Sequence, residues 1–70
     1  MTITARMIRD LLHFKGPLSY GDLLTMAHTA LDISNLTAAI NTGLERGDFK
    51  TKAIQVEGFT AEVFYTEWKE

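Results

Sequence analysis

Hydrophobic and polar positions follow helical spacing most regularly in residues 31–49. Four apolar residues fall on one side of a helix drawn through this stretch: Leu36, Ala39, Ile40 and Leu44. Small or polar residues fall on another side: Ser34, Thr37, Ala38, Asn41 and Thr42. This period predicts an amphipathic helix over residues 33–46.

The ends of this helix carry start and stop signals. Asp32 is a good N-cap residue, because its carboxylate accepts hydrogen bonds from free backbone N–H groups of the first turn. Leu31 and Leu36 are placed as a hydrophobic staple around it. Arg46 lies in the last turn, where a cation suits the helix dipole, and Gly47 is a natural C′ residue. The helix is therefore predicted to end at Arg46.

A first helix is predicted over Thr4–Lys15. Its buried stripe comprises Met7, Ile8, Leu11 and Leu12, with Phe14 as an additional member. The same period turns four residues towards water: Arg6, Arg9, Asp10 and His13. Gly16-Pro17 ends the helix, because glycine adopts the left-handed C′ conformation and proline cannot continue it.

A short second helix is predicted over Tyr20–His28, with Leu23, Leu24 and Ala27 on its inner face. Ser19 is its N-cap, and Asp22 completes a shortened capping box. The brief connection Thr29–Leu31 predicts that the next helix crosses near a right angle, as in a helix-turn-helix arrangement.

After Gly47 the period changes to alternation. Residues 49–56 and 61–68 are rich in strand-forming side chains, and residues 57–60 between them contain a turn glycine. They predict an antiparallel β-hairpin. Its register stays open, because Val63 and Tyr65 point one way, Phe64 the other, and one bulge would reverse the assignment. The predicted fold class is α+β, a three-helix core followed by a C-terminal hairpin.

Composition limits the kinds of protein this can be. Seventy residues, 46% of them hydrophobic and 23% charged, predict a single domain over residues 1–70. There is no cysteine, no signal-peptide pattern in the first ten residues, and no apolar run near the about 18 residues needed to span a bilayer. We therefore expect a cytoplasmic protein without membrane contact. The net charge of −2 argues against binding nucleic acid by bulk charge alone.

The sequence lacks the residue groupings of an enzyme. His13 and His28 share no metal-ligand spacing with an acidic pair, and the carboxylates are scattered. No serine or cysteine nucleophile constellation is present. We expect no catalytic residue, metal, cofactor or small-molecule substrate.

Three groups of residues carry a family resemblance: Gly16-Pro17-Leu18-Ser19, Leu23-Leu24, and Leu36…Ile40…Leu44-Glu45-Arg46-Gly47. Their order resembles the winged helix-turn-helix family of small bacterial and phage regulators. The resemblance implies a third helix in the major groove of double-stranded DNA and a hairpin wing near phosphate or the minor groove. The implied base-contacting residues are Ser34, Asn35, Thr37, Ala38, Asn41 and Thr42. The implied phosphate-binding residues are Arg6, Arg9, Lys15, Lys50 and Lys52.

The sequence departs from the family at two points. The base-contacting set has no arginine or lysine, the residues that most often contact guanine. Gly43 lies in mid-helix, where it costs about 1 kcal/mol relative to alanine. We expect either a bulky aromatic side chain, Phe64 or Trp68, or another backbone segment to pack over Gly43.

An alternative function is a protein-interaction module on the same scaffold, as a homodimer or an adaptor that does not bind DNA. Its contact surface would comprise Phe59, Phe64, Tyr65 and Trp68. These aromatic residues could equally cover the three-helix core. Basic side chains gathered around the third helix and hairpin would favour DNA, whereas scattered ones would favour a protein partner.

Overall fold

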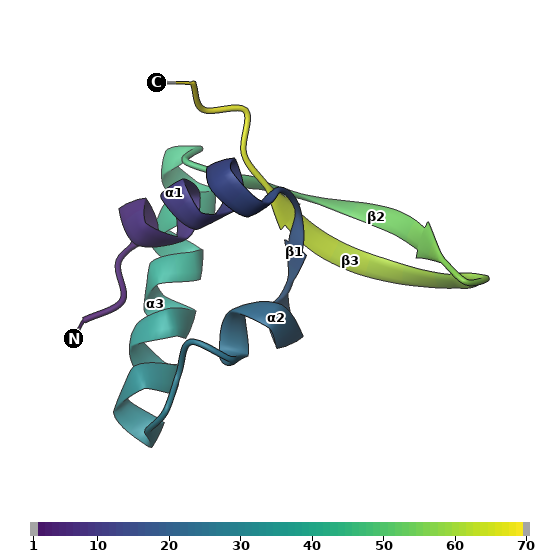
Figure 1. The fold of residues 1–70 in the computed structure, drawn as a ribbon. Helices are drawn as coiled ribbons and strands as arrows, with labels where there is room; N and C mark the ends of the chain where they lie inside the picture. The colour runs from purple at the N-terminus through teal and green to yellow at the C-terminus, as the bar shows by residue number, and fades with distance from the viewer. Residues whose placement is uncertain (1, 70) are drawn as a thin grey trace.

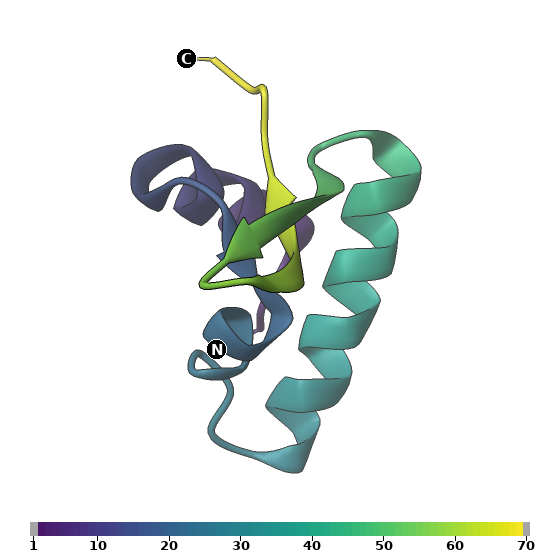
Figure 2. The ribbon, with the colours of Figure 1, turned by 90° about the vertical axis from the view of Figure 1, so that its right-hand side faces the viewer.

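A computed structural model describes residues 2–69 and shows helices followed by a three-stranded antiparallel sheet (Figure 1). The elements are α1 (Ala5–Lys15), β1 (Leu18–Ser19), α2 (Tyr20–Leu24), α3 (Ala30–Arg46), β2 (Lys50–Val56) and β3 (Phe59–Tyr65). The predicted α+β class is confirmed, and the order of elements is compatible with a winged helix. In Figure 2 the β2–β3 hairpin projects towards the viewer, between α1 and α3.

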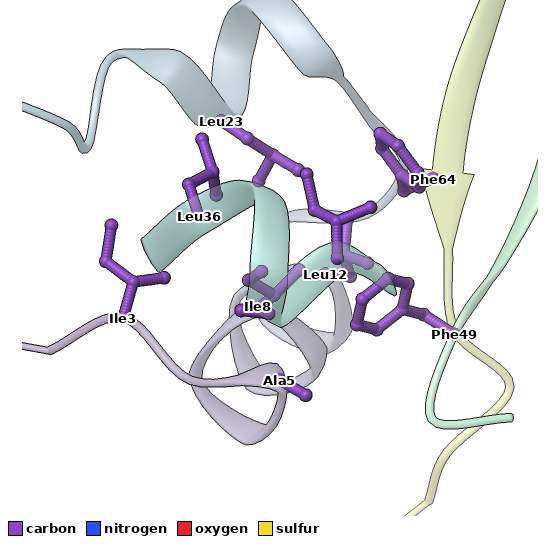
Figure 3. Close-up of a cluster of buried hydrophobic side chains, with 10 residues drawn as sticks. Ile3, Ala5, Ile8, Leu12, Leu23, Leu36, Phe49 and Phe64 are labelled. Carbon is purple, nitrogen blue, oxygen red and sulfur yellow. The ribbon is translucent and has the colours of Figure 1, made fainter. Parts of the chain in front are cut away.

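The core lies where α1, α2, α3 and the base of the hairpin meet (Figure 3). Its members are Ile3, Ala5, Ile8, Leu12, Leu23, Leu36, Ala39, Ile40, Phe49 and Phe64. Ile8 and Leu12 come from the predicted stripe of the first helix, with Leu11 and Met7 only partly buried. Phe14 is 74% exposed, so the prediction that it joins this stripe was wrong. Phe14 follows the buried Leu12 by two positions, which turns it about 200° round α1 and away from the core.

The third helix begins earlier than predicted. Thr29 is its N-cap, and the Thr29 hydroxyl accepts a hydrogen bond from the Asp32 N–H at 3.1 Å. Asp32 therefore lies inside the first turn, and its carboxylate accepts from the His28 N–H at 3.0 Å. The prediction of Asp32 as N-cap was wrong because Thr29, three residues earlier, is also a capping residue, and its hydroxyl caps the helix instead. Leu31 is 69% exposed, which excludes the predicted staple.

The second helix is shorter than predicted. It starts as expected, since Ser19 and Asp22 form the reciprocal capping box. It ends at Leu24 instead of His28, and the turn continues only through bonds to the third residue back, from Met26 and Ala27. The His28 N–H cannot extend the helix, because it is donated to the Asp32 carboxylate.

The hairpin has a two-residue turn. Glu57 and Gly58 have φ of 52° and 84°, and positive φ at both central residues is what a type I′ turn requires. The predicted four-residue loop was therefore too long, and β3 starts two residues earlier than expected. Lys52 lies opposite Val63 and Thr51 opposite Phe64, which settles the register. Leu18 and Ser19 add a third strand, β1, against Phe64 and Val63.

An aromatic ring packs over Gly43, as one of the two expected arrangements predicted. The ring belongs to Phe49, and not to Phe64 or Trp68. A Cβ on residue 43 would overlap the Phe49 ring. Phe49 is 1% exposed and meets Phe64 edge to face, with ring centroids 6.0 Å apart. Phe49 lies directly before β2, where the chain turns back after α3. Its side chain therefore packs against α3.

Candidate nucleic-acid interface

The outward face of α3 carries the six side chains implied as base contacts, and none of them is buried. Five of these residues are exposed and Asn35 is half-buried. The helix places them there because Leu36, Ala39, Ile40 and Gly43 take the opposite side into the core. The Thr37 hydroxyl donates to the Ile33 carbonyl at 3.1 Å, which leaves its methyl group and its oxygen lone pairs towards solvent.

A groove of about 430 Å³ runs beside this face, between α3 and the chain that leads into α1. The lining from α3 includes Asn35, Ala38, Thr42 and Arg46, and the lining from the N-terminal side comprises residues 2–6. Arg6 and Arg46 therefore lie along the same groove, although they are 40 positions apart in sequence. Two guanidinium groups in one groove form a cationic flank next to the polar face of α3.

Arg46 is a member that sequence reasoning missed. Its position in the last turn was interpreted only as a cation that suits the helix dipole, so its place in the groove was not predicted. The signal was its spacing: Arg46 follows Thr42 by four residues and thus lies on the same flank of α3. Its Nε lies 3.7 Å from an Asp48 carboxylate oxygen, while the Arg46 side chain stays 53% exposed. That separation exceeds a hydrogen bond, so the guanidinium keeps donors for another acceptor.

The structure disperses the five side chains implied as phosphate contacts. Only Arg6 lies in the groove beside α3. Arg9 pairs with Asp10 at 3.1 Å, and its guanidinium carbon lies 4.1 Å from the centroid of the Trp68 ring. Arg9 is thus a structural cation that holds the C-terminal segment on α1.

The lysines occupy two further places. Lys15 lines a separate hollow with Asp22 and Met26, at the opposite end of α1 from Arg6. Lys50 and Lys52 lie on one face of β2, because residues two apart on a strand share a face. The Lys50 ammonium is 3.9 Å from a Glu67 carboxylate, and Lys52 lies 4.8 Å from the centroid of the Tyr65 ring.

The aromatic side chains expected on a partner surface separate into different environments. Phe64 is 7% exposed in the core. Trp68 packs edge to face on His13 at 5.0 Å and beneath Arg9. Phe59, at 77% exposed, and the half-buried Tyr65 remain on the hairpin. The four side chains therefore do not form one surface. Of the four, only Phe64 packs in the core.

Among residues 2–69, no helix is long and apolar enough to cross a membrane. Within the same residues, no group of three or more histidine, cysteine or acidic side chains lies close enough to hold a metal ion. The chain was compared with protein-family models, curated proteins and solved structures, and none of them matches it.

Proposed function

We propose that this protein binds double-stranded DNA through the outward face of α3. The observation that supports the proposal most is the pairing of an uncovered polar helix face with a cationic groove along its flank. Asn41 and Thr42 lie on that face, while Arg6 and Arg46 line the groove. A helix of this kind fits the major groove, and arginines beside it can hold the phosphates that border that groove.

The side chains on α3 predict which bases would be preferred. Asparagine pairs bidentately with adenine, which suits Asn41 and Asn35. The methyl groups of Thr37 and Ala38 suit the thymine methyl. None of the six outward residues is an arginine or lysine, so the strong contact to guanine is absent from this face. We therefore expect preference for sites rich in A·T pairs.

The charge distribution predicts weak binding by a single chain. The net charge is −2, Arg9 is paired, and Glu45 lies on α3 close to the outward face. Arg6 and Arg46 would neutralise about two phosphates per chain, which gives a slope near −2 when log K is plotted against log salt. Such a protein would need low salt, a preferred sequence or a second copy to bind tightly.

Fluorescence anisotropy tests the proposal directly. Labelled duplexes, one A·T-rich, one G·C-rich and one of random sequence, would be titrated at about 20–200 mM salt, the range in which phosphate contacts change affinity strongly. We expect salt-dependent binding that is strongest for the A·T-rich duplex. Absence of binding to all three duplexes at the lowest salt would exclude DNA as the ligand.

A protein partner is the second candidate, and two observations favour it. Of the five expected phosphate-binding side chains only Arg6 lies in the groove beside α3, and scattered cations are what a protein-binding surface predicts. Apolar side chains are also exposed at two places. Leu31 and Ile33 lie at the start of α3 with 69% and 46% of their surface exposed, and Phe59 and Val56 are exposed on the hairpin. Exposed apolar side chains at either of these two separate places are typical of contact surfaces. Pull-down with no partner, together with DNA binding, would reject this candidate.

A further inference from the structure

One face of the hairpin is apolar along β3 and along the half of β2 nearest the turn, with Lys50 and Lys52 at its base. The β2–β3 register places six apolar side chains on that face: Ile54, Val56, Phe59, Ala61, Val63 and Tyr65. We call this set the apolar hairpin face. Phe64 points to the opposite side, towards the helices, where it joins the core. Towards the turn this face is therefore turned away from the core, whereas at its base Val63 is already buried by the protein's own chain.

Exposure on this face increases towards the turn. Val63, at the base, is 5% exposed, whereas Val56 and Phe59, beside the turn, are 48% and 77% exposed. The opposite face is polar beyond Phe64, with Thr51, Gln55, Thr60 and Glu62 all exposed. A hairpin surrounded only by water needs no apolar side, so this alternation indicates that another surface covers it.

Charges at the two ends of the hairpin indicate what that surface is. Lys50 and Lys52 lie at the base of β2 on the same side as the apolar hairpin face. Glu57 lies in the exposed turn at the other end. One end is thus cationic and the other anionic, with apolar side chains between them. This pattern is complementary to a copy of itself turned end for end.

We propose that the apolar hairpin face binds the same face of a second copy of this chain. The two hairpins pack face to face and antiparallel, so that the turn of each lies over the base of the other. Phe59 of one copy then lies over the partly exposed Tyr65 of the second copy, and Glu57 approaches Lys52 of that copy. The arrangement is a twofold-symmetric dimer.

The size of the face predicts a weak dimer. Strands of seven residues are about 23 Å long, and two of them make a strip about 10 Å wide. Such a strip falls below the about 800 Å² per partner of a stable interface, so dissociation in the micromolar range or above is expected. This inference concerns self-association without nucleic acid, and thus stands or fails independently of the proposed DNA binding.

Sedimentation equilibrium over protein concentrations from about 5 μM to 1 mM tests the inference, because a weak dimer populates both states within this range. We expect a monomer–dimer equilibrium in which Phe59→Ser raises the dissociation constant at least about tenfold. Phe14→Ser is the matched control, since Phe14 is 74% exposed on α1, and it should leave the equilibrium unchanged. A wild-type chain that stays monomeric at 1 mM, or a Phe59→Ser chain that associates normally, would overturn the proposal.

A charge exchange tests the antiparallel orientation. Glu57→Lys and Lys52→Glu should each weaken the dimer, and the double variant should restore it, because the two charges meet across the interface. Circular dichroism would confirm that each variant folds. Weakening by both single changes without recovery in the double variant would contradict the end-for-end arrangement.

Discussion

The ring of Phe49 occupies the space that a Cβ on Gly43 would fill. The two residues are six positions apart, across the end of α3 and the bend that follows it. Gly47, with φ of 78°, provides the left-handed residue that turns the chain. The glycine in mid-helix and the buried aromatic residue after the bend are therefore parts of one packing arrangement that fixes the hairpin against α3.

Gly43→Ala should lower the free energy of unfolding by up to about 2 kcal/mol. Alanine improves helix propensity by about 1 kcal/mol, but the added methyl group overlaps a ring in a filled core, and overpacking of this kind costs more. Urea denaturation followed by circular dichroism measures the change.

The double variant Gly43→Ala/Phe49→Leu provides the control. The smaller leucine leaves room for the methyl group, so the double variant should lose less stability than the sum of the two single changes. If Gly43→Ala proves more stable than the wild-type chain, the ring cannot lie where the structure places it.

Thr29→Ala should destabilise the fold by about 1 kcal/mol, because it removes the hydroxyl that caps α3. Ser34→Ala is the matched control, as Ser34 is an exposed position inside the same helix. It should change stability by less than about 0.5 kcal/mol. Equal effects of the two changes in chemical denaturation would argue against Thr29 as the N-cap.

Asp32 should make the start of α3 sensitive to acid. The N–H groups of His28 and Thr29 bond its carboxylate and lower its pKa below the ordinary value. A lowered folded-state pKa stabilises the fold above the unfolded carboxyl pKa of about 3.9, and this contribution is lost as pH falls through the folded value. The stability difference between the wild-type chain and Asp32→Asn should therefore be present at pH 7 and shrink below about pH 4. A difference that does not vary with pH would contradict this mechanism.

Substitutions on α3 and in its groove should affect DNA binding differently. Asn41→Ala should cost about 1–3 kcal/mol on the preferred duplex and little on random sequence. Arg6→Ala should weaken binding to all duplexes and reduce the salt slope by about 1. Lys15→Ala is the control, because Lys15 lines a different hollow. Identical losses for Asn41→Ala and Arg6→Ala on every duplex in anisotropy titrations would contradict the assigned roles.

Arg9→Ala should shift the fluorescence of Trp68, the single tryptophan, to longer wavelength. The Arg9 guanidinium covers the indole at 4.1 Å, so its removal exposes the ring to water. Arg6→Ala should leave the emission unchanged. An unshifted Arg9→Ala spectrum would show that the C-terminal segment does not rest on α1 in solution.

The sequence predicted most elements whose signals are local, and it failed where distant segments meet or where two neighbouring signals compete, as Thr29 and Asp32 do at the start of α3. The capping box at Ser19 and the stop at Gly47 depend on residues a few positions apart, and both are confirmed. β1 was missed because a strand of two residues has no measurable period and exists only by pairing with β3. Phe49 over Gly43 was missed for the same reason: the sequence showed that the glycine needed a large neighbour, but only the bend after α3 selects Phe49.

The candidate site shows the same division. Helical period alone placed Ser34, Asn41 and Thr42 on the outward face, and the structure agrees. Which cations lie near that face depends on how α1 meets α3, which periodicity cannot give. Arg9 and Lys15 were therefore included although other contacts engage or separate them. Arg46 was overlooked for another reason: its last-turn position already explained it, although its spacing from Thr42 places it on the same flank.

The uneven support of α3 has a consequence for its motion. The first core residue of the helix is Leu36, so the turn that starts at Ala30 extends beyond the packed interior, while the opposite end is clamped by Phe49. Amide hydrogen exchange should be fast near Ile33 and slow near Ile40, because local opening of α3 is easier at its start than at its packed end. The helix thus has a fixed C-terminal end and an N-terminal end that opens more readily.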